Sequence, residues 1–347
     1  MKASQIAQSL ATLIQIKQPA FLWGPPGIGK SQVVAQMASA LDLELVDVRA
    51  VLLDPVDLRG IPRITPEGEA QWCAPAFLPR RGEGVLFLDE LNAAPPLVQA
   101  ACYQLILDRR IGEYELPPGW TVIAAGNREQ DRAVAHRMPS ALSNRFVHLE
   151  FEVDAADWDV WARDAGLAPE VTGFIRFRPA LLHAFDPDRD DKAFPSPRSW
   201  EFVSRLTATR HFLGAGASNG GDSQDRVSDK ESRALFREMV AGTVGASAAA
   251  EFMGFLKVWN QLPRLQDILN DPHGMALPRD PAVLFALSEM LGRAMTMDNA
   301  QEIMAFAARL PVEFSVLLVR EAVRLDNGLV NTRAFEQWAR DNAQMLV

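Results

Sequence analysis

Long apolar runs, paired cysteines and clustered histidines are all missing from this sequence. It has no run of about 18 apolar residues, the length that a membrane-spanning helix needs. Its two cysteines, Cys73 and Cys102, are too few for a disulfide framework and lack partners at metal-ligand or redox spacing. The five histidines show no pairing at i, i+4 or with a nearby cysteine, which leaves a zinc site and a Cys/His hydrolase unsupported.

The composition is otherwise that of a soluble globular protein, with 48% hydrophobic and 23% charged residues. Gln and Ser interrupt the apolar positions near the N-terminus, so we expect no signal peptide, no membrane partner and a cytoplasmic location. A net charge of −9 argues against a surface devoted to nucleic acid, because such binding depends on Lys and Arg. The length of 347 residues suffices for two or three domains.

Residues 24–31 read Gly-Pro-Pro-Gly-Ile-Gly-Lys-Ser, the complete G-x-x-x-x-G-K-[ST] pattern. An apolar stretch at 20–23 suits a buried strand before it, and residues 32–41 have helical spacing after it. In this context backbone N–H groups and the helix N-terminus surround a phosphate, Lys30 neutralises its charge, and the Ser31 hydroxyl reaches Mg²⁺. The alternative is a chance Gly/Pro loop before a helix. We predict a nucleoside-triphosphate site formed by Gly24, Pro25, Pro26, Gly27, Ile28, Gly29, Lys30, Ser31 and Gln32.

Four apolar residues at 85–88 end in two acids, Asp89 and Glu90. A short, fully apolar run favours a central parallel strand covered on both faces, and ligands gather at the carboxyl ends of such strands. We predict that Asp89 joins Ser31 in the Mg²⁺ shell and that Glu90 orients or deprotonates the attacking water. The alternative is that the two acids cap the next helix.

A third strand predicted at 120–126 ends at Asn127, whose amide carries both a donor and an acceptor. Such a group suits a water held between Glu90 and a γ-phosphate. Residues 139–146 then precede the alternating stretch 147–151, which indicates another strand. Chemistry alone does not assign Arg145 in this segment, because an arginine at a helix end usually serves the dipole or solubility.

These stretches, in this order, resemble AAA+ ATPases, and in detail the MoxR branch of the helix-2-insert group. The matching segments are residues 24–31, 89–96, 125–127, 142–146 and 196–200, within a resemblance that covers about residues 18–212. The resemblance implies ATP as the nucleotide and a homo-oligomeric ring, usually a hexamer. It also implies that Arg145 is the finger reaching into the neighbouring subunit's site and that Arg198 contacts the γ-phosphate of its own. Nearby rivals for the finger role are Arg128, Arg132 and Arg137.

Two segments look like insertions into this pattern. Proline and glycine at 52–81 exclude a long helix, and residues 65–68 suit a turn between short strands. Residues 109–119 resemble a second hairpin of the same group. In the resembling rings such hairpins face the central channel or a ring surface and contact the client, which makes Trp72 and Tyr114 contact candidates. The alternative is an edge hairpin with a capping aromatic side chain.

The predicted fold class is α/β, with a P-loop AAA+ core of parallel sheet and β-hairpin insertions, an all-helical lid and a C-terminal helical region. We place the nucleotide-binding core at 1–153 and the lid at 154–260, with a flexible Gly/Ser-rich linker at 213–230. A helical bundle follows at 261–347. Trp158 and Trp161, three residues apart on a predicted helix, are expected to be core residues.

The predicted function is Mg²⁺-dependent ATP hydrolysis that drives chaperone-like remodelling or activation of a protein partner. By resemblance, that partner often carries a von Willebrand factor A-type domain. One alternative is a nucleic-acid motor of the helicase or restriction-translocase type, because Arg80–Arg81 and Arg109–Arg110 can line a basic pore. Another is a nucleotide-gated scaffold with little turnover, which the presence of Glu90 disfavours.

Overall fold

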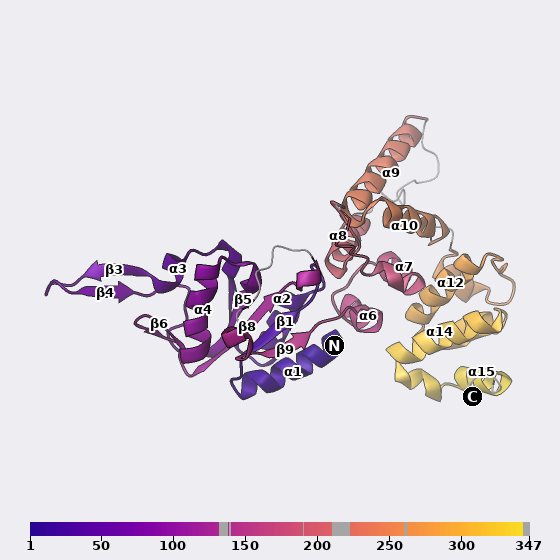
Figure 1. Cartoon of the computed structure of the whole chain (residues 1–347). Coiled ribbons are helices and arrows are strands. Elements are labelled where there is room, and N and C mark those ends of the chain that lie inside the picture. The colour runs from indigo at the N-terminus through magenta and orange to yellow at the C-terminus, as the bar shows by residue number, and fades with distance from the viewer. Residues whose placement is uncertain (132–137, 139, 190, 210–222, 260–261, 343–347) are drawn as a thin grey trace. The chain divides into compact units, whose positions relative to one another are not determined.

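The computed structural model describes the chain except residues 132–137, 139, 190, 210–222, 260–261 and 343–347 (Figure 1). The chain divides into two compact units. Unit 1 comprises Met1–Gly166 and Ala180–Val203, and unit 2 comprises Leu167–Pro179 and Ser204–Val347. The division predicted from the sequence, at 153/154 and 260/261, stays a prediction.

Unit 1 is built on a five-stranded parallel sheet with the strand order β2-β5-β8-β1-β9 (Figure 1). The strands are β1 (Ala20–Trp23), β2 (Glu44–Arg49), β5 (Glu83–Asp89), β8 (Gly119–Gly126) and β9 (Val147–Glu150). Trp23 pairs with Gly126 and with Glu150, so β1, β8 and β9 end at the same edge of the sheet. The predicted central strand ending at Asp89 is confirmed, because β5 lies between β2 and β8.

Helices cover both faces of this sheet. On one face Val85 and Phe87 of β5 pack with α1 (Ala3–Gln15) and α2 (Lys30–Ala40). On the other face the alternate β5 residues, Leu86 and Leu88, pack with α4 (Pro96–Asp108). Because both faces are buried, the strand reads as an uninterrupted apolar run. The other helical elements of unit 1 are η1 (Ala50–Leu52), α3 (Pro55–Arg59), η2 (Leu91–Ala93), η3 (Glu129–Asp131), α5 (Ser140–Ser143), α6 (Ala155–Asp164), η4 (Pro179–Leu181) and α8 (Pro197–Ala208), of which η4 and α8 span unit boundaries.

Both predicted hairpins are present. Strands β3 (Ile61–Ile64) and β4 (Ala70–Cys73) pair antiparallel and project from the sheet (Figure 1). Their turn contains Gly68 at a φ of 84°, a backbone conformation that favours glycine. Strands β6 (Arg110–Ile111) and β7 (Tyr114–Glu115) form the second, shorter hairpin.

The described part of unit 2 is helical, as the sequence predicted for this region. Its longer elements are α7 (Pro169–Phe177), α9 (Ser223–Val244), α10 (Ala246–Trp259), α11 (Leu265–Asn270), α12 (Pro281–Ala294), α13 (Ala300–Ala307), α14 (Val312–Leu325), η6 (Asn327–Asn331) and α15 (Arg333–Asp341). Asp280 caps α12 through the Ala282 N–H, and Thr332 caps α15 through the Phe335 N–H. The predicted fold class is therefore confirmed.

The predicted flexible linker at 213–230 is partly wrong. Residues 213–222 lie outside the described residues, but α9 begins at Ser223, so residues 223–230 are helical. The Gly/Ser-rich composition ends at Ser223, and the polar residues after it contain neither glycine nor proline, so nothing in them stops a helix. In the described part of the chain, no helix is both long and apolar enough to cross a membrane.

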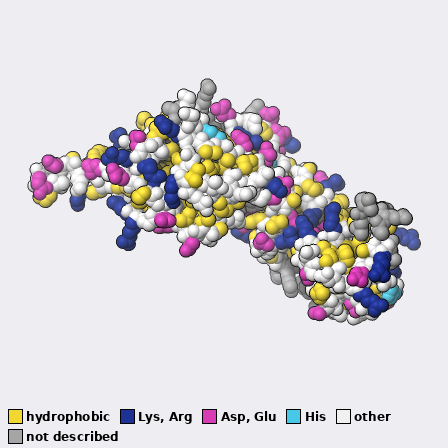
Figure 2. Space-filling view, turned by 90° about the horizontal axis from the view of Figure 1, so that it is seen from below, with side chains coloured by type: hydrophobic (Ala, Val, Ile, Leu, Met, Phe, Trp, Pro, Cys, Tyr) yellow, Lys and Arg dark blue, Asp and Glu magenta, His cyan; other side chains and the backbone are white. Residues whose placement is uncertain are grey.

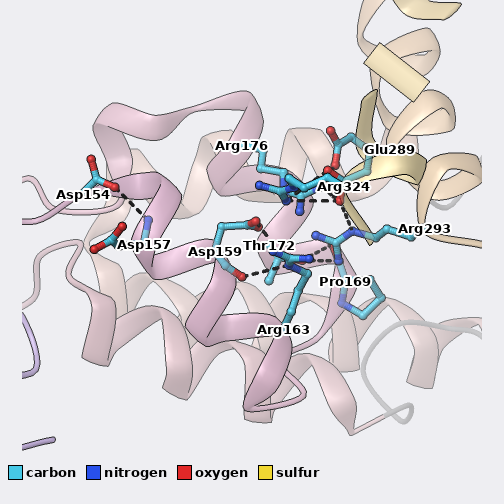
Figure 3. Close-up of polar contacts among 11 residues, drawn as sticks. Asp154, Asp157, Asp159, Arg163, Pro169, Thr172, Arg176, Glu289, Arg293 and Arg324 are labelled. Atoms are coloured by element: carbon cyan, nitrogen blue, oxygen red, sulfur yellow. Dashed lines mark hydrogen bonds and ion pairs between the residues drawn. The ribbon is translucent and has the colours of Figure 1, made fainter. Parts of the chain in front are cut away.

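A buried ion-pair network joins three helices of unit 2 (Figure 3). Arg176 of α7 pairs with Glu289 of α12 and, at 2.7 Å, with Glu321 of α14. Arg293 of α12 donates to the Thr172 hydroxyl of α7 at 2.8 Å. Burial raises the pKa of Glu289, and the Arg176 charge opposes that shift. Breaking one side of such a buried pair leaves an uncompensated charge, so these residues fix α7 against its neighbours.

Candidate functional site

The glycine loop runs from the end of β1 into the first turn of α2. Gly27 and Gly29 have φ values of 79° and 99°, and Gly29 is the N-cap residue of α2. Glycine permits this left-handed backbone, which turns the loop over the helix N-terminus. The first N–H groups of a helix lack partners within the helix, and with the helix dipole they form an anion site.

Lys30 lies at the mouth of this loop. Its Nζ donates to the carbonyl oxygens of Gly24 at 2.7 Å and Pro25 at 3.1 Å, and to Oδ1 of Asn127 at 2.9 Å. Burial lowers the pKa of Lys30 to about 8, although the nearby Asp89 carboxylate opposes the shift. The three oxygens that accept from the Lys30 ammonium are uncharged, so the oxygens of a bound phosphate can replace them.

Ser31 and Asp89 come together beside the loop. The Ser31 hydroxyl donates to Oδ2 of Asp89 at 2.8 Å, which joins the start of α2 to the end of β5. A hydroxyl and a carboxylate are the hard oxygen ligands that suit Mg²⁺, which usually retains waters and takes only one or two protein carboxylates. No group of three or more His, Cys, Asp or Glu suited to a metal occurs among the described residues. The two oxygens therefore fit Mg²⁺ bound together with phosphates.

Glu90 and Asn127 follow the ends of β5 and β8. Glu90 is exposed and has a left-handed backbone with a φ of 56°, and its N–H donates to Oδ1 of Asp89 at 3.0 Å. Behind them, the buried Asn92 donates to the Asn127 carbonyl at 2.7 Å. A Cβ on Gly126 would come within 1.9 Å of Oδ1 of Asn92, so only glycine allows this approach. The sequence signal for Asn92 is its place in residues 89–96, one of the segments that resemble the MoxR branch, but the sequence alone gives it no role.

The candidate arginines differ in their surroundings. Arg145 is exposed just after α5, and its carbonyl accepts from the Gln18 amide at 3.3 Å. Its rival Arg128 is paired with the buried Asp131 at 3.2 Å, which occupies its guanidinium. The other two rivals, Arg132 and Arg137, lie outside the described residues. Arg198 is the second residue of α8, and its N–H donates to the Gly27 carbonyl at 3.2 Å, so that it lies against the glycine loop.

A cavity of about 260 Å³ lies beside the glycine loop, entirely within unit 1. Gly27, Ser31 and Arg198 line it together with both tryptophans of α6. Trp158 is buried, as predicted, but it also faces this cavity, and its Nε1 has no partner among the described residues. The view of Trp158 and Trp161 as core residues was therefore incomplete, since helical spacing does not reveal an adjacent cavity.

Two further residues change the sequence-based picture. His183, which sequence reasoning passed over, has a pKa lowered by burial, and its hydrogen bond with the Pro26 backbone opposes that shift. It therefore contacts the glycine loop from a segment far away in sequence. Tyr114 was predicted to contact a client, but it is buried and its hydroxyl donates to the Pro79 carbonyl at 2.6 Å. Its ring packs into the core beneath the hairpin, whereas Trp72 is 40% exposed.

A glycine loop between a parallel strand and a helix, with a hydroxyl and a strand-end carboxylate hydrogen-bonded at its mouth, is characteristic of P-loop nucleoside triphosphatases. Residues 19–146 match the family model of the AAA domain (dynein-related subfamily). The site and the match agree on the class of protein. Nucleotide binding follows from this class.

Two curated proteins narrow this class. Protein NorQ from Paracoccus denitrificans is 32% identical over 170 residues, which span 46% of this chain and 62% of NorQ. The denitrification regulatory protein NirQ from Pseudomonas aeruginosa is 32% identical over 199 residues, which span 54% of this chain and 75% of NirQ. The chain belongs to the MoxR family of AAA+ ATPases, as its motifs predicted.

Solved structures resemble the chain only distantly. NtrX from Brucella abortus in complex with ATP matches over 99% of this chain and 68% of its own, at 13% identity and a TM-score of 0.40.

The lowered pKa of Lys30 predicts that nucleotide binding weakens in alkaline solution. Below pH 8 the lysine is already protonated in the free protein, whereas above pH 8 the proton that phosphate charge requires must be taken up on binding. Affinity for ADP should therefore be flat below pH 8 and fall by up to about tenfold per pH unit above it. Calorimetry at pH 7, 8 and 9 in two buffers of different ionisation enthalpy measures both effects. Lys30→Arg, which stays protonated, is the matched control, and binding without proton uptake at pH 9 would contradict the prediction.

Proposed function

We propose that this protein is a ring-forming, Mg²⁺-dependent ATPase that uses hydrolysis to remodel or activate a protein partner. The observation that carries the proposal is the meeting of Lys30, the Ser31–Asp89 pair and Asn127 at one edge of the sheet. Lys30 and Ser31 begin α2, Asp89 ends β5, and Asn127 directly follows β8. Their convergence supports a site in which a cation, a metal-binding pair and a water-binding amide surround one phosphate position.

The proposed mechanism assigns each group a role. Lys30 exchanges its present acceptors for phosphate oxygens, which releases Oδ1 of Asn127 to accept a hydrogen bond from the attacking water. Glu90, exposed at the adjacent strand end, accepts the proton of that water as it attacks the γ-phosphorus. Mg²⁺, held by Ser31 and Asp89, would supply charge neutralisation to the phosphates when bound.

The remaining roles concern the two exposed arginines. Arg198 lies against the glycine loop, and we assign it to the γ-phosphate of its own subunit. Arg145 lies in the turn between the short helix α5 and β9, and β9 is the strand at one edge of the sheet. A cation on this edge suits a site completed by a neighbouring subunit, where it would stabilise transition-state charge. A homo-oligomeric ring, with a hexamer as its expected form, provides that neighbour.

The proposed partner is a protein, of a type that by family resemblance often carries a von Willebrand factor A-type domain. NirQ, by its name a denitrification regulatory protein, supports a regulatory action on another protein. The projecting β3–β4 hairpin offers Trp72, Ile61 and Ile64 as exposed apolar contacts. We place this activity in the cytoplasm.

A nucleic-acid motor is the alternative that uses the same ATPase site. Arg80 and Arg110, both exposed near the insertions, favour it. The net charge of −9 opposes it, and Figure 2 shows basic and acidic side chains interspersed on the face in view. Glu90, exposed directly after β5 where it can reach a water, opposes a scaffold with little turnover.

A trapped ring distinguishes these functions. Glu90→Gln, loaded with ATP, is used as bait in a lysate of the native host, and Lys30→Ala serves as the bait that cannot bind nucleotide. We expect mass spectrometry to identify the same protein with the trap in repeated captures, in amounts that nuclease treatment leaves unchanged, and little of it with Lys30→Ala. Nucleic acid in the captured material, or capture abolished by nuclease, would favour the motor.

A further inference from the structure

An imidazole bridges the strand that leads into the glycine loop and the turn that carries Arg145. His148 of β9 accepts a hydrogen bond at Nδ1 from Nε1 of Trp23, at 2.8 Å. Its Nε2 lies 2.8 Å from the carbonyl oxygen of Ser143 and 3.1 Å from the Ser143 hydroxyl. The Trp23 and His148 rings are stacked, with centroids 6.0 Å apart and an interplanar angle of 23°. Trp23, His148 and Ser143 are thus linked by consecutive hydrogen bonds, which we call the histidine bridge.

The chemistry of these groups settles the direction of each hydrogen bond. An indole N–H can only donate, so Nδ1 of His148 must carry a lone pair. The proton of the neutral ring then lies on Nε2, which donates to the Ser143 carbonyl. Both ring nitrogens are used, and the imidazole is fixed in one tautomer and one orientation.

Each end of the histidine bridge is adjacent to a group with a proposed role. Trp23 is the last residue of β1 and directly precedes Gly24, the first residue of the glycine loop. Ser143 is the last residue of α5 and precedes Arg145 by one residue of turn. The Arg145 N–H donates to the Leu142 carbonyl at 2.9 Å, so the turn is itself tightly hydrogen-bonded. The position of Ser143 therefore controls that of Arg145.

The hydrogen bonds of the histidine bridge contribute little to the fold itself. The β1–β9 pairing, in which Phe21 lies opposite His148, is made by the backbone. Phe146 packs edge-on against Phe21, at 5.5 Å between centroids, and the His148 ring lies 6.2 Å from Phe21 and 6.3 Å from Phe146, a ring contact that another aromatic side chain can also make. Because His148 is exposed, water can replace its hydrogen bonds, and losing them leaves no buried polar group unsatisfied. What water cannot supply is the fixed distance between β1 and the turn.

We propose that His148 is a positioning residue for Arg145: it holds the turn that presents this arginine to the neighbouring subunit. The inference rests on the finger role proposed above for Arg145. Its consequence is that one side chain connects the glycine loop of a subunit with the cation that the same subunit lends to its neighbour.

His148→Phe tests the proposal because it keeps an aromatic ring on β9 and removes both hydrogen bonds. We expect turnover to fall about tenfold or more, since small displacements of a catalytic group are costly, while the Kd for ATP stays within about twofold. Trp23→Phe removes the indole N–H together with part of the ring system that packs on Phe21, and it should show the same separation of kcat from Kd. Thermal unfolding in the presence of ADP establishes that both variants are folded.

Combination with Arg145→Ala separates positioning from a general structural effect. In single-turnover assays, His148→Phe should change hydrolysis less than about twofold when Arg145 is already absent, because no finger remains to be positioned. Mixing His148→Phe with Lys30→Ala subunits should restore activity, since the second subunit lends a correctly held finger. An equal loss in both backgrounds, no restoration in mixed rings, or normal turnover by both His148→Phe and Trp23→Phe would overturn the proposal. Normal turnover by Arg145→Ala would instead overturn the finger assignment itself.

Discussion

Lys30→Ala is expected to abolish nucleotide binding, whereas Glu90→Gln should retain ATP and lose hydrolysis. The lysine supplies charge-assisted hydrogen bonds to phosphate already in the ground state, so its removal should raise Kd by about a hundredfold or more. The Glu90 carboxylate acts only on the attacking water, and its loss should lower turnover by about 10²- to 10⁴-fold. Calorimetric ATP affinity and phosphate release under saturating ATP measure the two effects separately.

The structure supplies a control for each variant. Lys257→Ala removes an exposed lysine in unit 2 and should leave both measurements unchanged. Glutamine fits the left-handed backbone at position 90 no worse than glutamate, so a loss of hydrolysis would report chemistry and not the loop conformation. Equal loss of ATP binding in both variants would contradict the role given to Glu90.

Arg145→Ala should bind ATP nearly normally and hydrolyse it on the order of 10³-fold more slowly. A cation directed at the transition state contributes little to ground-state affinity. In mixed rings an Arg145→Ala subunit keeps its own glycine loop, and a Lys30→Ala neighbour can lend it an intact finger. Some activity should therefore return on mixing, although each variant alone is inactive. Turnover across a series of mixing ratios measures this recovery.

The same mixing experiment on the rival arginines can contradict the assignment of the finger to Arg145. Arg128→Ala breaks the pair with Asp131 and should alter the loop after β8 within its own subunit, so mixing with Lys30→Ala should not rescue it. If mixed rings form and Arg145→Ala is never rescued, while Arg128→Ala, Arg132→Ala or Arg137→Ala is, the finger has been assigned to the wrong residue.

The parts of the site that the sequence predicted are those fixed by local chain geometry. The glycine loop must follow a strand and precede a helix, so Lys30 and Ser31 could be placed from an eight-residue pattern. Asp89 could be placed because parallel strands end at a common edge, and the structure shows its hydrogen bond with Ser31. The β3–β4 hairpin followed from turn residues, whereas the β6–β7 hairpin was predicted from the resemblance to the helix-2-insert group. The predictions for Lys30, Ser31, Asp89 and the first hairpin needed only neighbouring residues and one rule about sheets.

What sequence reasoning missed depends on contacts between distant segments. His183 meets the Pro26 backbone and Trp158 lines the cavity beside the glycine loop because the chain returns to the loop after long excursions. Tyr114 looked like an exposed hairpin aromatic, yet a carbonyl at Pro79 satisfies its hydroxyl and allows burial. Hydrophobic periodicity carries no information about such pairings.

Helix α7 determines how this protein can be dissected. It belongs to unit 2, although the chain on both sides of it belongs to unit 1. Its Phe174 packs on Phe252, at 5.2 Å between ring centroids, and its Arg176 pairs with Glu289 and Glu321. A truncated chain ending at Val203 would keep α7 but lose Phe252, Glu289 and Glu321, which would expose an aromatic face and remove both of these carboxylates from Arg176. The nucleotide-binding unit therefore cannot be obtained by a single cut, and a soluble fragment requires replacing residues 167–179 with a short polar connection.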